Sequence, residues 1–393
     1  MAGQGFGRFG LTLILPDMRA GLGMSYADLG LIAGAAFGAY LLCAAPAGAA
    51  AARFGPRRVV SSCLALSAVA LAVTGLAPSF PLALAAQALN GAVGAGIVVP
   101  VLGLGPSWFG PRSRARATGV VVAGGGVGLA ISGVLIPAAL RAGGADGWRL
   151  AWFSLALGLL ATAGLATVLL GDPPRPPGAP ARRPCLRAVY RSPAVWWIGL
   201  IFGCYGMAFA VYGTFFGAQL VSQRGLDPEP AGRLWSLVGL VSVVSGLLGG
   251  WLADRFGRRG PLAVLFLAEG FALGALGLGA DERWYLASAL LYGLTVWGFP
   301  AVIIAAAADV VGPDLTPAAV GLAVMCFGIG QATGPPAGGL LAEWTGSFDL
   351  ALLLGALADA LGLLATLVAL RATAPATAAG AVEVRANRPT EGG

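Results

Sequence analysis

A chain of 393 residues with 58% hydrophobic and only 10% charged residues is too apolar for a soluble protein, in which roughly 25% of residues are charged. Its net charge of +7 comes from arginine alone, because the sequence contains no lysine and no histidine. A Walker-type nucleotide loop is excluded, since it needs a lysine, and the missing histidine argues against an enzyme or a metal site.

Apolar runs of about 20 residues, the length that crosses a membrane, follow one another along the chain. We expect eleven full spans, near 28–50, 58–77, 80–105, 117–140, 148–170, 193–218, 233–253, 261–280, 284–308, 315–341 and 348–370. The segment 1–16 is apolar but shorter. We interpret it as the second half of a first helix whose beginning lies upstream of Met1.

The segment 171–192, GDPPRPPGAPARRPCLRAVYRS, divides the spans into two groups, and its prolines prevent a continuous helix. We therefore expect an N-terminal six-helix bundle at 1–170 and a basic cytoplasmic linker at 171–192. A C-terminal six-helix bundle follows at 193–371, and a disordered cytoplasmic tail at 372–393.

Arginine positions predict the orientation. Seventeen of the 24 arginines fall in turns and tails on one side of the expected membrane, and six fall on the other. Because cytoplasmic segments carry the excess of positive charge, this bias predicts a multi-pass protein of a bacterial inner membrane with both complete termini in the cytoplasm.

The two halves resemble each other. Residues 48–58 read GAAAARFGPRR and residues 249–259 read GGWLADRFGRR, so the two segments begin 201 residues apart. Small residues spaced by four predict faces of close helix contact. These faces are Gly30, Gly34 and Gly38; Gly124, Gly128 and Ser132; Ser242, Gly246 and Gly250; and Gly330, Gly334 and Gly338.

The second of these turns resembles the signature loop of the major facilitator superfamily. The match lies at Gly250, Asp254, Arg255, Gly257, Arg258 and Arg259. The first turn keeps Arg53, Gly55, Arg57 and Arg58 but has Ala52 where the family has aspartate. The runs GFGRFGLTLILPDM at 5–18 and GIGQATGPPAGGLLAEWTG at 328–346 are similar to helices one and eleven of an uncharacterised bacterial branch.

The resemblance implies an all-α membrane protein of the major-facilitator type, with two pseudo-symmetric six-helix bundles that rock about a central cavity. It implies that both arginine turns act as gating loops. Asp254 would accept hydrogen bonds from a helix N-terminus and pair with an arginine, which holds the cytoplasmic side closed. The alternative is that these arginines only set the orientation.

Arg8 is the candidate for an anion contact, because a charge inside the membrane usually faces a cavity or a partner. By resemblance, further substrate-binding candidates lie on helices four, seven, ten and eleven. They are Gln87 and Asn90, Tyr205 and Tyr212, Tyr292 and Trp297, and Gln331. The aromatic residues could instead only pack between helices or anchor at the interface.

Glu269 and Asp359 lie deep in spans, and each is either a proton site or a structural bond to a neighbouring helix. We expect a secondary active transporter of a small organic anion such as a carboxylate, working by alternating access with proton coupling or exchange. Efflux of amphiphilic drugs and a non-transporting membrane sensor are the alternatives. We expect a monomer in the lipid bilayer whose partners are the solute and protons, with no catalytic residues, no cofactor, no metal and no nucleic acid.

Overall fold

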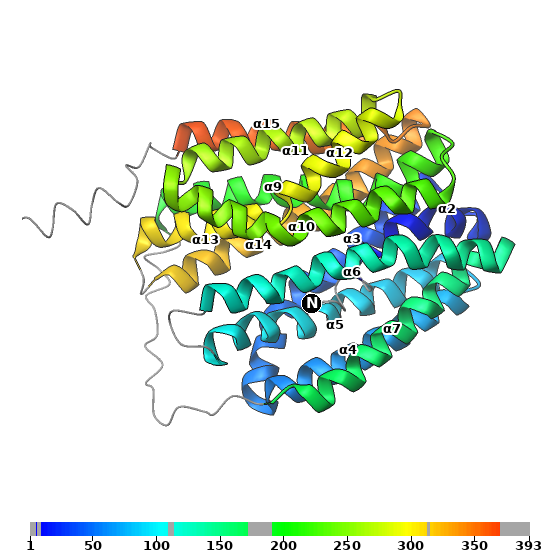
Figure 1. The fold of residues 1–393 in the computed structure, drawn as a ribbon, viewed down its shortest axis with the longest axis horizontal. Helices are drawn as coiled ribbons and strands as arrows, with labels where there is room; N and C mark the ends of the chain where they lie inside the picture. Colours follow the sequence, from blue (N-terminus) through cyan, green and yellow to red (C-terminus); the bar gives the residue numbers. More distant parts are fainter. Residues whose placement is uncertain (1–4, 6–8, 109–113, 172–190, 313–314, 370–393) are drawn as a thin grey trace, which may run out of the picture.

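The computed structural model describes residue 5 and residues 9–108, 114–171, 191–312 and 315–369, and every element in these ranges is a helix (Figure 1). We call the helices before residue 172 the first half and those after residue 190 the second half. The helices of the first half are α2 (Leu11–Leu22), α3 (Tyr26–Phe54), α4 (Pro56–Leu76), α5 (Phe80–Trp108), α6 (Arg114–Gly143) and α7 (Gly147–Leu169), with a short turn η1 (Gly144–Asp146) before α7.

The second half begins with α9 (Pro193–Ala218), which continues into a π-helical turn η2 (Gln219–Gln223). The remaining helices are α10 (Pro228–Phe256), α11 (Arg259–Leu278), α12 (Glu282–Thr295), α13 (Gly298–Val311), α14 (Thr316–Thr345) and α15 (Asp349–Ala369). Figure 1 shows the two halves side by side, with their helices running along the long axis of the molecule.

The described residues contain ten apolar stretches long enough to cross a membrane, and one of them, Ala123–Leu169, holds both α6 and α7. The eleven predicted spans are therefore all present, and the shorter α2 precedes them. The expected all-helical membrane fold is confirmed.

One predicted span is not continuous. The run 284–308 is divided into α12 and α13 at Val296 and Trp297. Pro300 has no N–H to offer the carbonyl of Val296 four residues before it, so the helix breaks there. The Tyr205 hydroxyl donates a hydrogen bond to that carbonyl instead.

Small residues bring the two halves together along α3 and α14, α6 and α10, and α2 and α9. A Cβ added at Gly133 of α6 would lie 2.5 Å from the Gly232 carbonyl oxygen of α10, so only glycine fits. Gly126 and Gly133 of α6 meet α10, and the predicted stripe of Gly330, Gly334 and Gly338 on α14 packs closely against α9 of its own half.

The repeated turns have matching geometry. Gly55 and Gly257 both adopt a positive φ, 90° and 76°, which a residue with a Cβ rarely adopts. Arg57 then donates to the carbonyl of Thr167 in the last turn of α7, and Arg259 donates to that of Leu367 in the last turn of α15. Each arginine thus satisfies a carbonyl that the end of its neighbouring helix leaves unpaired.

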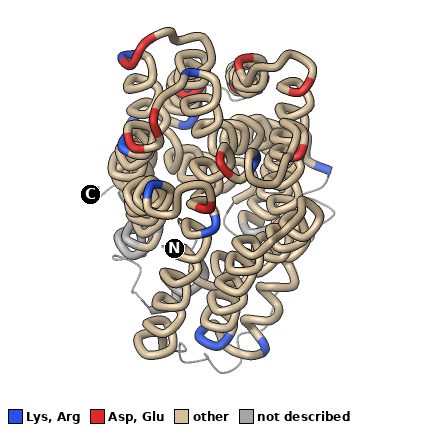
Figure 2. Tube along the Cα trace, turned by 90° about the vertical axis from the view of Figure 1, so that its right-hand side faces the viewer, with Lys and Arg blue, Asp and Glu red and all other residues tan. Residues whose placement is uncertain are grey.

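These two turns define one end of the bundle, which we call the arginine end. The turns that follow α2, α4, α6, η2, α11 and α14 lie at the opposite end, which we call the acidic end because Asp146, Glu229, Asp281, Glu343 and Asp349 gather there among arginines. Figure 2 looks onto the acidic end and shows these mixed charges on its loops. The sequence predicts that the arginine end faces the cytoplasm.

Candidate functional site

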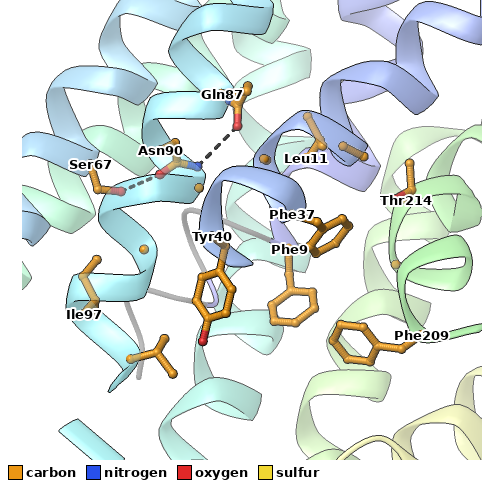
Figure 3. A pocket seen from close by; sticks show the side chains of 16 residues that line it. Phe9, Leu11, Phe37, Tyr40, Ser67, Gln87, Asn90, Ile97, Phe209 and Thr214 are labelled. Atoms are coloured by element: carbon orange, nitrogen blue, oxygen red, sulfur yellow. Dashed lines mark hydrogen bonds between the residues drawn. The ribbon is translucent and has the colours of Figure 1, made fainter. Parts of the chain in front are cut away.

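A cavity lies where the first half meets α9 of the second half (Figure 3). Its volume is about 40 Å³, room for a few water molecules or part of a compact solute. It is lined by Phe9, Leu11, Ala33, Ala36, Phe37, Tyr40, Ser67, Gln87, Asn90, Gly91, Gly94, Ile97, Val98, Phe209, Gly213 and Thr214. All of these lining residues are uncharged at neutral pH. The described part of the wall has a polar side and an apolar side.

The polar wall is a chain of hydrogen bonds between α4 and α5. The Ser67 hydroxyl donates to Asn90 Oδ1 at 2.6 Å, Asn90 Nδ2 donates to Gln87 Oε1 at 3.3 Å, and Gln87 Nε2 donates to the Thr74 hydroxyl at 3.2 Å. The Thr74 hydroxyl in turn donates to the Ala70 carbonyl at 2.9 Å, so every donor points the same way. This fixed order holds the two amides rigid.

The Gln87 amide nitrogen carries two hydrogens, and the bond to Thr74 uses one of them. A second N–H is then available for an oxygen of a solute in the cavity. A buried amide pair of this kind is the usual means of orienting a ligand in a mainly apolar pocket.

The apolar wall is aromatic and joins the two halves. The Phe9 ring packs edge-on against Phe209 of α9, with ring centroids 5.7 Å apart. Trp297, at the break between α12 and α13, packs against both rings, 6.3 Å from Phe9 and 6.4 Å from Phe209. Phe37 and Tyr40 of α3 continue this wall (Figure 3).

Two of the predicted binding residues, Gln87 and Asn90, line the cavity, and Trp297 lies directly behind it. Arg8 lies outside the described residues. Gln331 is buried in α14 and does not line this cavity.

Tyr205, Tyr212 and Tyr292 do not line the cavity either; they form the core of the second half. Tyr205 stacks on Phe299 with centroids 4.2 Å apart, and Tyr212 stacks on Tyr292 at 3.7 Å. Their hydroxyls serve structural partners, since Tyr212 bonds to Ser288 at 2.9 Å and Tyr292 donates to the Phe209 carbonyl at 3.3 Å. In this structure the three tyrosines pack between helices, and their role in substrate binding stays a prediction.

Sequence reasoning missed several wall residues, notably Ser67, Phe37 and Tyr40. Ser67 could have been found only by pairing α4 with α5, because its partner Asn90 is 23 residues away. Tyr40 carried a weak signal, as it is a polar aromatic residue within an apolar span.

Polar contacts join the halves at the acidic end. The Glu343 carboxylate of α14 accepts hydrogen bonds from the backbone N–H groups of Tyr26 at 2.7 Å and Ala27 at 3.4 Å. These are the first residues of α3, so the carboxylate occupies the positive end of a helix in the other half. Arg141 of α6 also pairs with Glu229 of α10 at 2.9 Å.

Changing Glu343 to glutamine should weaken the contacts that hold the two halves together at the acidic end. An exposed charge at a helix N-terminus contributes about 0.3–1 kcal/mol, which corresponds to a shift of about twofold to fivefold toward a state open at the acidic end. The measurement is the rate at which an impermeant thiol reagent labels Gly213→Cys in a cysteine-free background, since a Cβ at Gly213 meets only Phe9, at 4.0 Å.

The control for this variant is Glu282→Gln, the same change on an exposed residue of the acidic end at the start of α12. It should leave the labelling rate unchanged. Equal rates in Glu343→Gln and the parent protein would show that this contact does not hold the halves together.

At the arginine end the described polar contacts stay within one half. Arg258 donates to Asp309 of α13 at 2.9 Å and to Asp254 of α10 at 3.1 Å. Burial alone would lower the pKa of Arg258, but the hydrogen bonds and negative charges of Asp309 and Asp254 raise it above its ordinary value. Asp254 therefore has its predicted arginine partner, and the gating role of both loops stays a prediction.

Two six-helix groups, a cavity between them and duplicated arginine turns define a membrane transporter of the major-facilitator fold. The family profile described as the uncharacterised MFS-type transporter YbfB matches residues 1–367, and the chain belongs to this family of transporters, which are not enzymes.

The chain is 29% identical to human monocarboxylate transporter 11 over 366 residues, covering 88% of this chain and 75% of that protein. It is 26% identical to the probable sulfoacetate transporter SauU of Cupriavidus necator, over 92% of this chain and 89% of SauU. It is also 26% identical to the 3-(3-hydroxy-phenyl)propionate transporter of Escherichia coli, over 88% and 83% of the two chains.

Solved structures share the fold. The occupied, inward-facing structure of a bacterial homologue of the human lysosomal transporter Spinster aligns with a TM-score of 0.76, at 17% identity and over 95% of both chains. The nucleoside transporter NupG aligns with a TM-score of 0.76, at 14% identity and over 94% of this chain and 96% of NupG.

Proposed function

We propose that this protein is a secondary active transporter that moves a small organic anion, such as a carboxylate, across the bacterial inner membrane by alternating access. The observation that carries the proposal is the cavity between the halves, in which a rigid amide and hydroxyl wall faces an aromatic wall. The three relatives above are named as transporters of organic anions, which supports the same substrate class.

The cavity walls suit a solute with a polar head and an apolar body. The carboxylate accepts a hydrogen bond from the second N–H of the Gln87 amide, next to Asn90, and the body packs between Phe9, Phe37 and Phe209. The contacts at the acidic end hold this arrangement closed on that side, so the solute enters and leaves through the arginine end in this conformation.

An anion also needs a positive partner, and the described lining is uncharged. Arg8 is the candidate, because it immediately precedes Phe9, which lines the cavity. Its role rests on the sequence alone.

The test is uptake into proteoliposomes of lactate, benzoate, 3-phenylpropionate and sulfoacetate, with and without a pH gradient, beside an amphiphilic cation. We expect saturable uptake of at least one of these anions. Preferred transport of the cation would favour the amphiphile-efflux alternative, for which the aromatic wall is also suited. Absence of any transport would favour a sensor.

The Arg8→Ala variant should raise the KM for the transported anion about tenfold, as expected for the loss of one charged hydrogen bond of about 1.5 kcal/mol. Arg8→Lys keeps the charge and should recover part of the affinity. An unchanged KM in Arg8→Ala, with intact folding, would remove Arg8 from the mechanism.

A further inference from the structure

Two acidic side chains lie in the core of the second half, away from the cavity. Glu269 of α11 is 0% exposed and Asp359 of α15 is 1% exposed. The two helices pack together, and a Cβ added at Gly270, the residue after Glu269, would lie 3.9 Å from Asp359 Oδ2. Asp359 thus lies against the segment of α11 that carries Glu269, near enough for the charge of Glu269 to act on the Asp359 carboxyl group.

Neither group has a partner that would neutralise a negative charge. All four carboxyl oxygens are buried without a hydrogen-bond partner, and neither residue belongs to any of the ion pairs in the described part of the chain. An unpaired carboxylate in such a place is very costly, so the neutral acid is the form that fits this conformation. Two carboxyl groups whose charges act on each other bind and release protons as a pair.

Among the residues that the structure describes, the polar and titratable groups around the pair supply no counter-charge. They are Tyr212 and Cys204 from α9 and Tyr292 and Thr295 from α12, with Tyr205 beside Tyr292. The tyrosine hydroxyls are engaged with Val296, Ser288 and Phe209, as described above. The Thr295 hydroxyl, which lies close to Glu269, donates to the Tyr292 carbonyl at 3.1 Å.

The same tyrosines connect the pair to the cavity. Glu269 interacts electrostatically with both Tyr212 and Tyr292. Tyr292 donates to the backbone carbonyl of Phe209, and the Phe209 ring forms part of the cavity wall. A change of charge at the pair therefore acts on the segment of α9 that the solute touches.

We propose that Glu269 and Asp359 form the proton-binding site that couples solute transport to the pH gradient. This proposal rests on the proposed function and deepens it. In the present conformation the pair is protonated and sealed from water. When the second half rearranges, a carboxyl group gives its proton to water as H₃O⁺ and becomes a hydrated carboxylate. It takes up a proton again from the other side, so that solute and proton cross together.

The first experiment detects the proton itself. In the purified protein at neutral pH, infrared spectroscopy should show the C=O stretching band of protonated carboxyl groups, because ordinary exposed acids are ionised there. Glu269→Gln and Asp359→Asn should each weaken or remove this band, whereas Glu282→Gln, on an exposed acid, should keep it. No band in the parent protein, or an unchanged band in both variants, would overturn the proposal.

The second experiment separates coupling from transport. Proteoliposomes carrying Glu269→Gln or Asp359→Asn should exchange 3-phenylpropionate or lactate across the membrane without a pH gradient but lose accumulation driven by the gradient. A purely structural role would lower both activities together, and that result contradicts the proposal. If the parent protein transports none of the four anions of the uptake test, the proposed function fails, and the infrared band still decides whether the pair holds a proton.

Discussion

Changing Asn90 to aspartate is expected to lower uptake of the organic anion by about 100-fold or more. The change keeps the size of the side chain and places a negative charge in the wall of the cavity. Two like charges about 4 Å apart repel by about 4 kcal/mol at an effective dielectric constant of about 20, which is about 1,000-fold in binding, and partial protonation or hydration of the new carboxyl group reduces this figure.

Uptake should recover as the pH falls, because protonation of the new carboxyl group removes the repulsion. The control is Gln223→Glu, which adds the same charge near the acidic end, outside the cavity lining. An Asn90→Asp protein that transports the anion normally would place the binding site elsewhere. Enhanced transport of a cation would indicate that the substrate is positively charged.

Changing Gly133 to leucine is expected to stop the transport cycle. A Cβ at this position meets the Gly232 carbonyl oxygen at 2.5 Å and the Ser236 backbone nitrogen at 2.7 Å, both in α10 of the other half. Backbone atoms cannot move aside as a side chain can. We therefore expect a destabilisation at the high end of the range for overpacked sites, about 3 kcal/mol. This cost falls on the state closed at the acidic end and shifts the population by about 150-fold.

The measurement combines uptake with labelling of Gly213→Cys from the acidic end, and labelling should rise as uptake falls. Gly164→Leu is the matched control, since Gly164 is exposed on α7 and a Cβ there meets no atom within 4 Å. Normal uptake by Gly133→Leu would contradict a rearrangement at this contact between α6 and α10. A general folding defect would instead lower the thermal stability of the protein together with its uptake.

The membrane fold could be predicted from the sequence because spans need long apolar runs, and these are local. The break in the helix near Pro300 could in principle be predicted from the sequence, because proline has no N–H to donate to the Val296 carbonyl. The sequence does not show that Tyr205, 91 residues earlier, supplies the missing hydrogen bond. The glycine stripes predicted which helices come close to a neighbour, but a stripe does not identify that neighbour, which for Gly330 and Gly334 is α9.

The site could be predicted only in part, because residue spacing reports contacts within one helix but not contacts between helices. Gln87 and Asn90 share one face of α5, so helical spacing alone brings them together. The aromatic residues of α9 all looked alike in sequence, yet Phe209 faces the cavity and Tyr205 and Tyr212 face the core. The contact between Glu343 and the start of α3 joins residues 317 positions apart, and no local pattern reports such a pair.

The central claim is that the two halves tilt in opposite senses about the cavity when the solute is carried. Spin labels test it directly when placed in pairs on exposed positions, Ala145 and Arg283 at the acidic end and Val168 and Val368 at the arginine end. Adding the transported anion should change the two distance distributions in opposite directions, with one end opening as the other closes. Distances that stay fixed at both ends, or that change in the same direction, would contradict alternating access in this protein.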